Sequence, residues 1–289
     1  MEHSLSVKGK RFDFGGTILY VLLTLFGLLM LAPLVYMVST AFKPTSELFL
    51  FPPRFFVMEP TIRNFNDLVL ATGTSIVPFS RYIFNSFIVS GAIVVLGALI
   101  AAMAAYPLSK HNMPFRKMIF SMIIFALMFA PQVTQIPQFL VINKLGIINT
   151  YFALILPFVA APVGMFLMKQ FADQIPDVLL EAVKIDGAGE WKTFWIIVIP
   201  MLKPALATFA LISFIAAWND PFSATIYTTT ENMKTLPNAL QTIQGGAGVV
   251  ARVGTVAAAS LLMTIPTILV FIISQKMVLE TMAHSGIKE

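Results

Sequence analysis

Six apolar stretches alternate with charged segments along the chain. None of its 19 basic or 14 acidic residues lies in these stretches. The six stretches are 17–41, 83–107, 118–142, 151–168, 204–219 and 253–275. A helix needs about 20 apolar residues to cross a hydrocarbon core of about 30 Å, whereas membrane strands would alternate polar and apolar residues. The pattern therefore predicts an all-α membrane protein with six transmembrane helices.

The segments between the stretches differ greatly in length. The predicted tails are residues 1–16 and 276–289, and a long segment, 42–82, follows the first helix. The segment 169–203 has 35 residues, far more than a helix connector requires. We therefore expect this segment to have a function of its own.

Positive charge predicts the orientation in the membrane. With the N-terminus inside, the cytoplasmic segments carry 12 Lys and Arg residues and the external segments carry 7. Cytoplasmic loops are enriched in Lys and Arg, so both termini are predicted to be cytoplasmic. The first stretch has 25 residues, too long for the apolar part of a signal peptide, and is predicted to remain as an uncleaved anchor.

Composition excludes several kinds of chemistry. The chain is 57% hydrophobic and 11% charged, and its net charge of +5 is better explained by basic loops near anionic lipid than by nucleic acid. There is no cysteine, which excludes disulfides and thiolate nucleophiles, and the 3 histidines are scattered. We therefore expect neither a metal site nor catalytic residues.

The segment 169–203 has the pattern of two short helices separated by glycine. Asp177 suits the first turn of one helix, Gly187 suits its left-handed end, and 190–199 places aromatic residues at helical spacing. Two interpretations remain open for this amphipathic elbow. It could lie on lipid headgroups, where Lys and Trp are favourable, or it could dock onto another protein.

The residues of this elbow resemble a known motif. From Glu181 the order is Glu-Ala-Val, three residues, Gly187, nine residues, Ile197, one residue, and Ile199 before Pro200. This resembles the EAA loop in the permease subunits of bacterial ABC importers, with Val183 and Ile199 as mild departures. The resemblance implies a type I ABC importer permease fold. It also implies an ATPase-coupling site formed by Glu181, Ala182, Asp186, Gly187, Ala188 and Pro200.

The remainder of the chain resembles carbohydrate permeases of the maltose type. The sequence Trp218-Asn219-Asp220 and the later Thr235-Leu236-Pro237 are similar to the end of their fifth helix and the loop after it. The resemblance implies a subunit that imports a carbohydrate, in particular an oligosaccharide, by alternating access in the bacterial inner membrane. Two alternatives are a non-sugar ABC permease and an ion-coupled secondary transporter. The charge-free stretches argue against the latter and against an intramembrane enzyme.

The resemblance also implies a set of partners. These are a second, homologous permease subunit in a heterodimer, two cytoplasmic ATPase subunits and an extracytoplasmic solute-binding protein. The chain has no G-x-x-x-x-G-K-[ST] sequence to hold a phosphate. ATP and Mg²⁺ are therefore expected on the ATPase subunits, and no cofactor is expected on this chain.

By the same resemblance, Glu181 would pair with a basic residue of the ATPase. Ala182 and Ala188 would permit close approach, and Gly187 would form the turn. The alternative for Glu181 is a pair with Lys184 within the helix, at the i, i+3 spacing, which is worth about 0.2–0.5 kcal/mol.

Polar residues in or beside the apolar stretches are candidates for a substrate pathway. They are Gln132, Gln135, Gln138, Asn85, Trp218, Asn219 and Asp220. The glutamines and Asn85 could instead link helices by hydrogen bonds. Trp218 could be an interfacial aromatic residue rather than a sugar-stacking one, and Asp220 an ordinary helix-end carboxylate.

Overall fold

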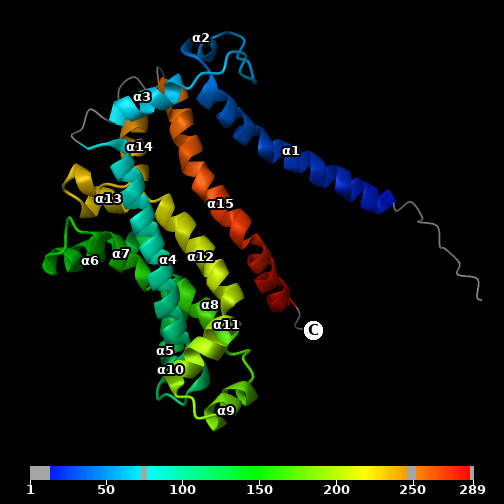
Figure 1. Ribbon diagram of the computed structural model, residues 1–289, viewed down its shortest axis with the longest axis vertical. Coiled ribbons are helices and arrows are strands. Elements are labelled where there is room, and N and C mark those ends of the chain that lie inside the picture. The colour runs from blue at the N-terminus through cyan, green and yellow to red at the C-terminus, as the bar shows by residue number, and fades with distance from the viewer. Residues whose placement is uncertain (1–13, 73–76, 246–251, 287–289) are drawn as a thin grey trace, which may run out of the picture.

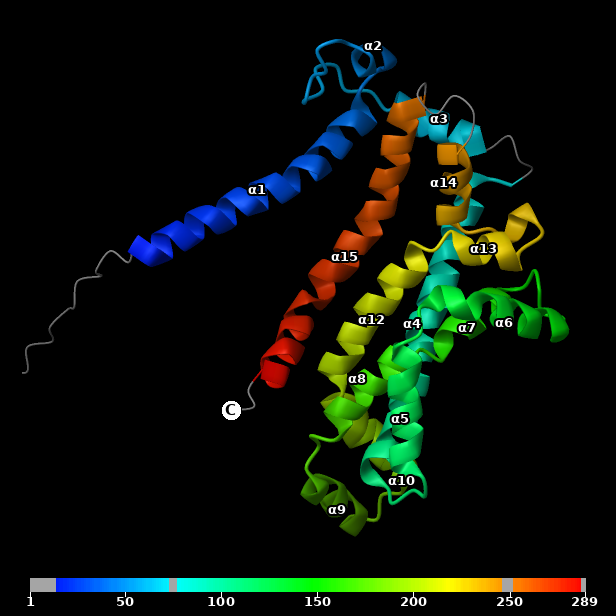
Figure 2. The ribbon, with the colours of Figure 1, turned by 180° about the vertical axis from the view of Figure 1, so that it is seen from behind.

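The computed structural model describes residues 14–72, 77–245 and 252–286, and these residues form helices and turns without a strand (Figure 1). Helices α4, α12 and α15 lie side by side, with a short-helix region at each end of this bundle (Figures 1 and 2). The helices are α1 Phe14–Phe42, α2 Thr45–Leu48, α3 Arg63–Thr72, α4 Phe79–Lys110, α5 Arg116–Leu127, α6 Pro131–Lys144, α7 Tyr151–Val159, α8 Pro162–Ala172, α9 Asp177–Ile185, α10 Glu190–Thr193, the π-helical turn η1 Phe194–Val198, α11 Ile199–Met201, α12 Lys203–Trp218, α13 Phe222–Tyr227, the 3₁₀ turn η2 Glu231–Met233, α14 Leu236–Gly245 and α15 Val253–Gly286.

Three helices are long and apolar enough to cross a membrane without a break: α1, α4 and α15. Three further apolar segments are pairs of helices joined at a bend, so the described chain has up to six spans when each pair counts as one. This number agrees with the six stretches predicted from the sequence. Helix α15 continues to Gly286, through most of the segment predicted as a C-terminal tail, whereas residues 1–13 of the predicted N-terminal tail lie outside the described residues.

The third predicted span, 118–142, is not a straight helix. Helices α5 and α6 meet at 108°, and α6 begins at Pro131. Proline has no N–H to donate, and its ring forces the preceding residue out of helical geometry; Ala130 is extended at ψ 135°. Ala161 and Pro162 produce a milder bend of 43° between α7 and α8 by the same mechanism. The apolar pattern therefore predicted the positions of the spans, but it did not predict the bends at Pro131 and Pro162.

One aromatic side chain joins three of the spanning segments. Phe209 on α12 is 1% exposed, and its ring lies against Gly97 of α4 and Gly164 of α8. A Cβ built on Gly164 would lie 2.5 Å from Phe209 Cε2, and one on Gly97 would lie 3.1 Å from Cζ. The ring fits between these helices because neither glycine has a side chain. Small residues at helix interfaces are common in membrane bundles.

Helix α1 stands apart from the others. It meets the rest of the molecule at its C-terminal end and diverges from α15 towards its N-terminus (Figures 1 and 2). Asn64 on α3 fixes this end, because its side-chain amide donates to the Ala41 and Lys43 carbonyls at 2.9 and 2.8 Å. Its Oδ1 also lies 2.4 Å from where a Cβ of Gly254 on α15 would be. The asparagine thereby links α1, α3 and α15.

Replacement of Gly164 by alanine is expected to destabilise the fold. The new methyl group would overlap the Phe209 ring, and overpacking of a filled core costs about 1–3 kcal/mol. Gly91 on α4 is the matched control, since a Cβ there meets nothing within 4 Å. We expect Gly164→Ala to lower the midpoint of thermal unfolding in detergent and Gly91→Ala to leave the midpoint unchanged. Equal midpoints for the two variants would contradict the packing argument.

Candidate functional site

The segment after α8 forms the predicted elbow of two helices. Helix α9 ends at Ile185, and Gly187 has a φ of 77°, in the left-handed region. The Ala188 N–H donates to the Val183 carbonyl at 3.1 Å, and the Gly187 N–H donates to the Lys184 carbonyl at 3.0 Å. These two bonds form a Schellman motif, which glycine closes without steric strain. The left-handed helix end predicted at Gly187 is confirmed.

One side of α9 faces solvent. Leu180 is the buried residue of this helix and packs into the core formed with α4 and α8. Ile185 is 86% exposed, and the predicted coupling residues Glu181, Ala182 and Asp186 are exposed as well. Of the other predicted coupling residues, Gly187 and Pro200 are exposed and Ala188 is half-buried. The helix therefore presents a face with apolar and acidic side chains that the described chain does not cover.

Glu190, which sequence analysis did not assign to the site, links this elbow to α4. Its carboxylate accepts hydrogen bonds from the Tyr106 hydroxyl at 2.8 Å and from Lys184 Nζ at 2.7 Å. His111 Nε2 lies 3.3 Å from the same carboxylate. Tyr106 lies in the last turns of α4, His111 is the C-cap residue of that helix, and Lys184 belongs to α9. One carboxylate thus connects both arms of the elbow to a spanning helix.

The Glu181–Lys184 pair considered from the sequence does not form. Lys184 instead reaches across the glycine turn to Glu190. No hydrogen bond or ion pair to Glu181 is found in the described part of the chain. The Glu181 carboxylate is therefore exposed and available to a partner.

A second acidic residue fixes the entrance to the elbow. Asp173 accepts hydrogen bonds from Ser109 Oγ and Lys169 Nζ, both at 2.6 Å, and Arg116 lies 3.8 Å away. Burial by itself raises the pKa of this carboxyl, but the Lys169 and Ser109 hydrogen bonds and the nearby positive charges bring the pKa below its ordinary value. Asp173 is therefore ionised at neutral pH and holds the α4–α5 turn against the end of α8.

A third link joins this turn to α9. Lys110 at the end of α4 donates to Asp177 Oδ1 at 2.8 Å and to the Ile175 carbonyl. Charges at and after the end of α4 thus meet opposite charges at the end of α8 and the start of α9. The sequence does not indicate these contacts, because their residues are far apart in the chain. Lys110 and Asp177 are 67 positions apart, and Tyr106 and Glu190 are 84 positions apart. Only the i, i+4 spacing of Lys169 and Asp173 was visible as a local signal.

The position of Trp218 corrects both sequence interpretations. The side chain is 1% exposed, its Nε1 donates to the Met263 carbonyl at 2.9 Å, and its ring stacks on Phe214 with centroids 5.5 Å apart. Phe87 covers it at 4.8 Å. A ring enclosed by three helices neither reaches the lipid interface nor offers a face to a sugar, so Trp218 packs the core between α4, α12 and α15.

Asn85 is also occupied by contacts within the chain. It is 0% exposed, and its amide donates to the carbonyls of Asn232 and Lys234, both at 2.8 Å. The Tyr151 hydroxyl donates to its Oδ1 at 2.6 Å. These bonds attach the loop before α14 to α4 and α7. Of the two interpretations, linking fits these contacts, and solute passage does not.

Asp220 and Asn219 act as local helix-end residues. Asp220 Oδ1 accepts from the Phe222 N–H at 2.9 Å, and Oδ2 accepts from Ser223 Oγ, so the carboxylate caps α13. Asn219 donates to the Ile215 carbonyl at 2.9 Å. Asp220 also borders a cavity of about 10 Å³, which has room for about one water molecule. Among the residues that the structure describes, this cavity is too small to admit a sugar.

The three glutamines lie on α6, which projects away from the long helices (Figure 1). Gln132 is exposed, and Gln135 and Gln138 are half-buried. None of the three side chains makes a hydrogen bond to the described residues. The three glutamines therefore do not link helices among the described residues, and their role in a substrate pathway stays a prediction.

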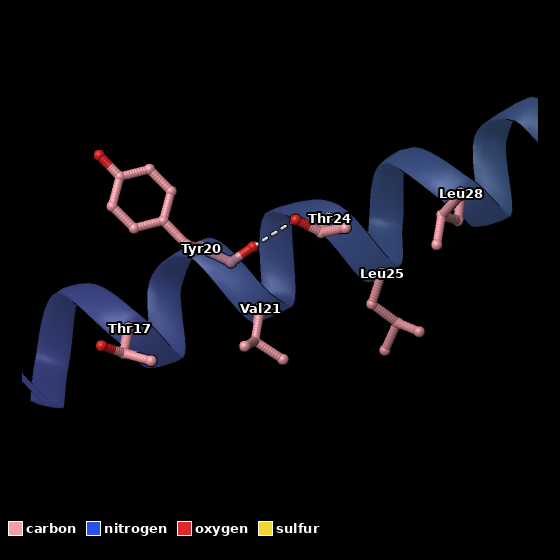
Figure 3. Close-up of a pocket in the computed structure, with 6 residues that line it drawn as sticks. All are labelled: Thr17, Tyr20, Val21, Thr24, Leu25 and Leu28. Atoms are coloured by element: carbon pink, nitrogen blue, oxygen red, sulfur yellow. Dashed lines mark hydrogen bonds between the residues drawn. The ribbon is translucent and has the colours of Figure 1, made fainter.

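A shallow hollow on the surface is lined by residues of α1 alone. Thr17, Tyr20, Val21, Thr24, Leu25 and Leu28 line it (Figure 3). The Thr24 hydroxyl donates to the Tyr20 carbonyl at 2.8 Å, and the lining residues carry no charge. Elsewhere, the residues that the structure describes contain no group of three metal-ligating side chains. Neither feature adds chemistry to the elbow.

Comparison with known proteins matches nearly the whole chain. It is 31% identical over 258 residues to the sn-glycerol-3-phosphate transport system permease protein UgpE of Yersinia enterocolitica, with 89% of this chain and 92% of that protein covered. It is 28% identical over 262 residues to the arabinooligosaccharides transport system permease protein AraQ of Halalkalibacterium halodurans, with 89% and 90% covered.

A solved structure has the same architecture. A chain of a bacterial ABC transporter involved in import of the acidic polysaccharide alginate superposes with a TM-score of 0.78 and 25% identity, covering 90% of this chain and 95% of that one. The predicted fold class, an all-α ABC importer permease, is confirmed. Residues 93–282 match the family model of the binding-protein-dependent transport system inner membrane component. The chain belongs to this family and is a multi-pass permease subunit of an ABC importer.

Proposed function

We propose that this permease imports a carbohydrate and that α9 couples its movement to ATP hydrolysis on separate subunits. The observation that carries the coupling role is the exposed face of α9, with Glu181 unpaired and Ile185 projecting, on a helix attached to α4 through Glu190 and Asp177. A helix that is free on one side and fixed on the other can transmit a displacement from a docked subunit to a spanning helix.

The carbohydrate assignment rests on similar proteins. Two of them, by name, transport arabinooligosaccharides and the acidic polysaccharide alginate, and another transports sn-glycerol-3-phosphate. An oligosaccharide is the proposed substrate, and a polyol phosphate is the second candidate. Because Trp218 and Asn85 are buried and bonded within the chain, the solute contacts of the transporter must include other residues of this chain or of its partner.

The proposed assembly contains a second permease subunit, two ATPases and an extracytoplasmic binding protein. ATP and Mg²⁺ belong to the ATPases in this proposal, and no cofactor belongs to this chain. The proposal puts both termini in the cytoplasm. It assigns the basic α4–α5 turn and α9, with Lys110, Arg116, Lys169 and Lys184, to the same side of the membrane, since cytoplasmic loops are enriched in Lys and Arg.

Substitution of Gly187 by valine is expected to uncouple transport. A β-branched residue at a φ of 77° costs about 1–3 kcal/mol, which displaces the elbow from its closed turn. Gly189 is the matched control, because its φ of −72° accepts valine. In proteoliposomes of the assembled transporter, Gly187→Val should lower uptake about tenfold or more, while Gly189→Val retains it. Equal uptake by the two variants would count against α9 as the coupling helix.

Substitution of Glu190 by alanine is expected to loosen α9 while the chain stays inserted. The carboxylate is the common acceptor of Tyr106 and Lys184, so its loss frees both arms of the elbow. The chain has no cysteine, so spin labels can be attached at Ile185→Cys and Lys117→Cys without background. The distance distribution between the labels should broaden for Glu190→Ala. Glu181→Ala, which removes an unpaired carboxylate, should leave it unchanged; an unchanged width in both would refute the positioning role.

The substrate class is tested by ATP turnover in the reconstituted transporter with its binding protein. Neutral oligosaccharides, acidic oligosaccharides and glycerol phosphate form the panel. We expect a saccharide to stimulate turnover severalfold above the basal rate. Stimulation by glycerol phosphate alone would favour a polyol phosphate as the substrate. If no saccharide stimulates turnover, the carbohydrate assignment is rejected.

A further inference from the structure

We propose that the helical segment Glu190–Met201 lies in the cytoplasmic headgroup layer of the membrane and binds anionic phospholipid. Trp191 and Trp195 would enter the layer, and Lys192 and Lys203 would contact phosphate groups. The two arms of the elbow then have different partners, since α9 is left for protein. This inference requires that the chain spans a membrane, and it does not depend on the coupling role of α9.

The first observation is the direction of the segment. Glu190–Met201 and Lys203–Trp218 meet at 73°. Membrane-spanning helices tilt on average by about 20° from the membrane normal, so a segment nearly perpendicular to α12 lies close to the membrane plane. Its junction with α12, at Leu202 and Lys203, is the cytoplasmic end of that span. The segment is therefore at the depth where interfacial helices lie.

The second observation is the division of its side chains. Thr193, Phe194 and Val198 are buried against the helix core, whereas the opposite side is open. Trp191 is 62% exposed and Trp195 is 45% exposed, and Ile196 and Met201 are exposed beside them. Tryptophan rings concentrate at membrane interfaces, because one part of the ring is apolar and the N–H can remain hydrated.

The tryptophans are held in place rather than extended at random. The Trp191 ring stacks on buried Phe194 with centroids 5.8 Å apart, and it meets the Trp195 ring edge-on at 6.2 Å. Phe194 also contacts Trp195 at 5.4 Å. A fixed apolar surface of this kind, exposed to water, would be unfavourable. Coverage by lipid removes that cost without any rearrangement of the chain.

Charge distinguishes lipid from protein as the partner. Lys192 and Lys203 are exposed, and neither forms an ion pair within the described residues. Glu190 is neutralised by Lys184. Lys192 in the segment and Lys203 just beyond its junction with α12 therefore present two unpaired positive charges, which attract an anionic leaflet by about 1 kcal/mol each.

On α9 and at its C-cap, the unpaired exposed charges are Glu181 and Asp186, and the Asp177 and Lys184 charges are paired. An anionic surface repels this arm. The glycine turn thus separates an acidic arm from a basic, aromatic arm, and the second is the one that suits anionic lipid. This division reconciles the two interpretations that the sequence left open for the elbow as a whole.

Tryptophan fluorescence can test this contact, because the chain has 3 tryptophans and Trp218 is 1% exposed. The full chain would be placed in nanodiscs of phosphatidylcholine and phosphatidylglycerol, with bromine near the headgroup end of one lipid at a time. Trp218→Phe leaves the interfacial pair, and Trp191→Phe with Trp195→Phe leaves Trp218 as a buried control. If Trp218→Phe does not fold, the difference between the unaltered chain and the double variant isolates the pair.

Brominated phosphatidylglycerol is expected to quench Trp191 and Trp195 about twofold or more strongly, per mole of lipid, than brominated phosphatidylcholine. Lys192→Gln with Lys203→Gln should remove this preference. Quenching no greater than that of Trp218, or equal quenching by both lipids in the unaltered chain, overturns the inference. So does loss of quenching when the ATPase subunits are added, which would assign the surface to them. Uptake measurements with Gly187→Val test coupling separately and do not affect this outcome.

Discussion

Exclusion of charge from hydrocarbon is the constraint on which the rest of this structure depends. Because the spanning segments carry almost no charge, the charged side chains collect at their ends, and each buried or half-buried one needs a partner there. At the end of the bundle that carries α9, this need produces the links around Asp173, Asp177 and Glu190. The same constraint that sorts the chain into six spans therefore assembles the support beneath α9.

The links position α9 more than they stabilise the fold. Exposed ion pairs contribute about 0–1 kcal/mol each, and Lys184 and Glu190 are both half-exposed. The free energy of folding at this corner comes instead from the core that contains Leu180, Phe194 and Tyr106. The Phe209 ring packs between α4, α8 and α12, and each of these helices has one end at this corner of the molecule. A displacement of α9 would thus reach three spanning segments as one packed unit.

The sequence predicted features that depend on local pattern. The apolar stretches located the spans, and the position of Gly187 predicted a left-handed turn because few other residues adopt that conformation. The sequence did not predict that Trp218 is buried between helices. An aromatic residue at the end of an apolar stretch is compatible with lipid, substrate or core, and only the approach of Phe87 from α4 and Met263 from α15 encloses the ring.

The same limit explains why Glu190 was missed. Its partners come from α4 and α9, and nothing in the spacing of Tyr106, His111 and Glu190 indicates that they meet. The 108° bend at Pro131 was missed for a different reason: prolines in apolar stretches were visible, but a proline within a membrane helix can be accommodated with little bending, as Pro107 in α4 shows. Neighbouring segments decide which outcome occurs.

The division of the elbow gives a physical reason for the glycine turn beyond its geometry. An acidic arm next to an anionic leaflet would be repelled, and a basic, aromatic arm next to water would be poorly solvated. The turn at Gly187 allows the chain to change direction between the two, so that the exposed Glu181 and Asp186 precede the turn and the exposed Trp191 and Trp195 follow it. Lys184 crosses the turn to Glu190 and keeps the two arms at a fixed angle. If the basic arm lies in the headgroup layer as proposed, the bilayer is the fixed support against which α9 is displaced.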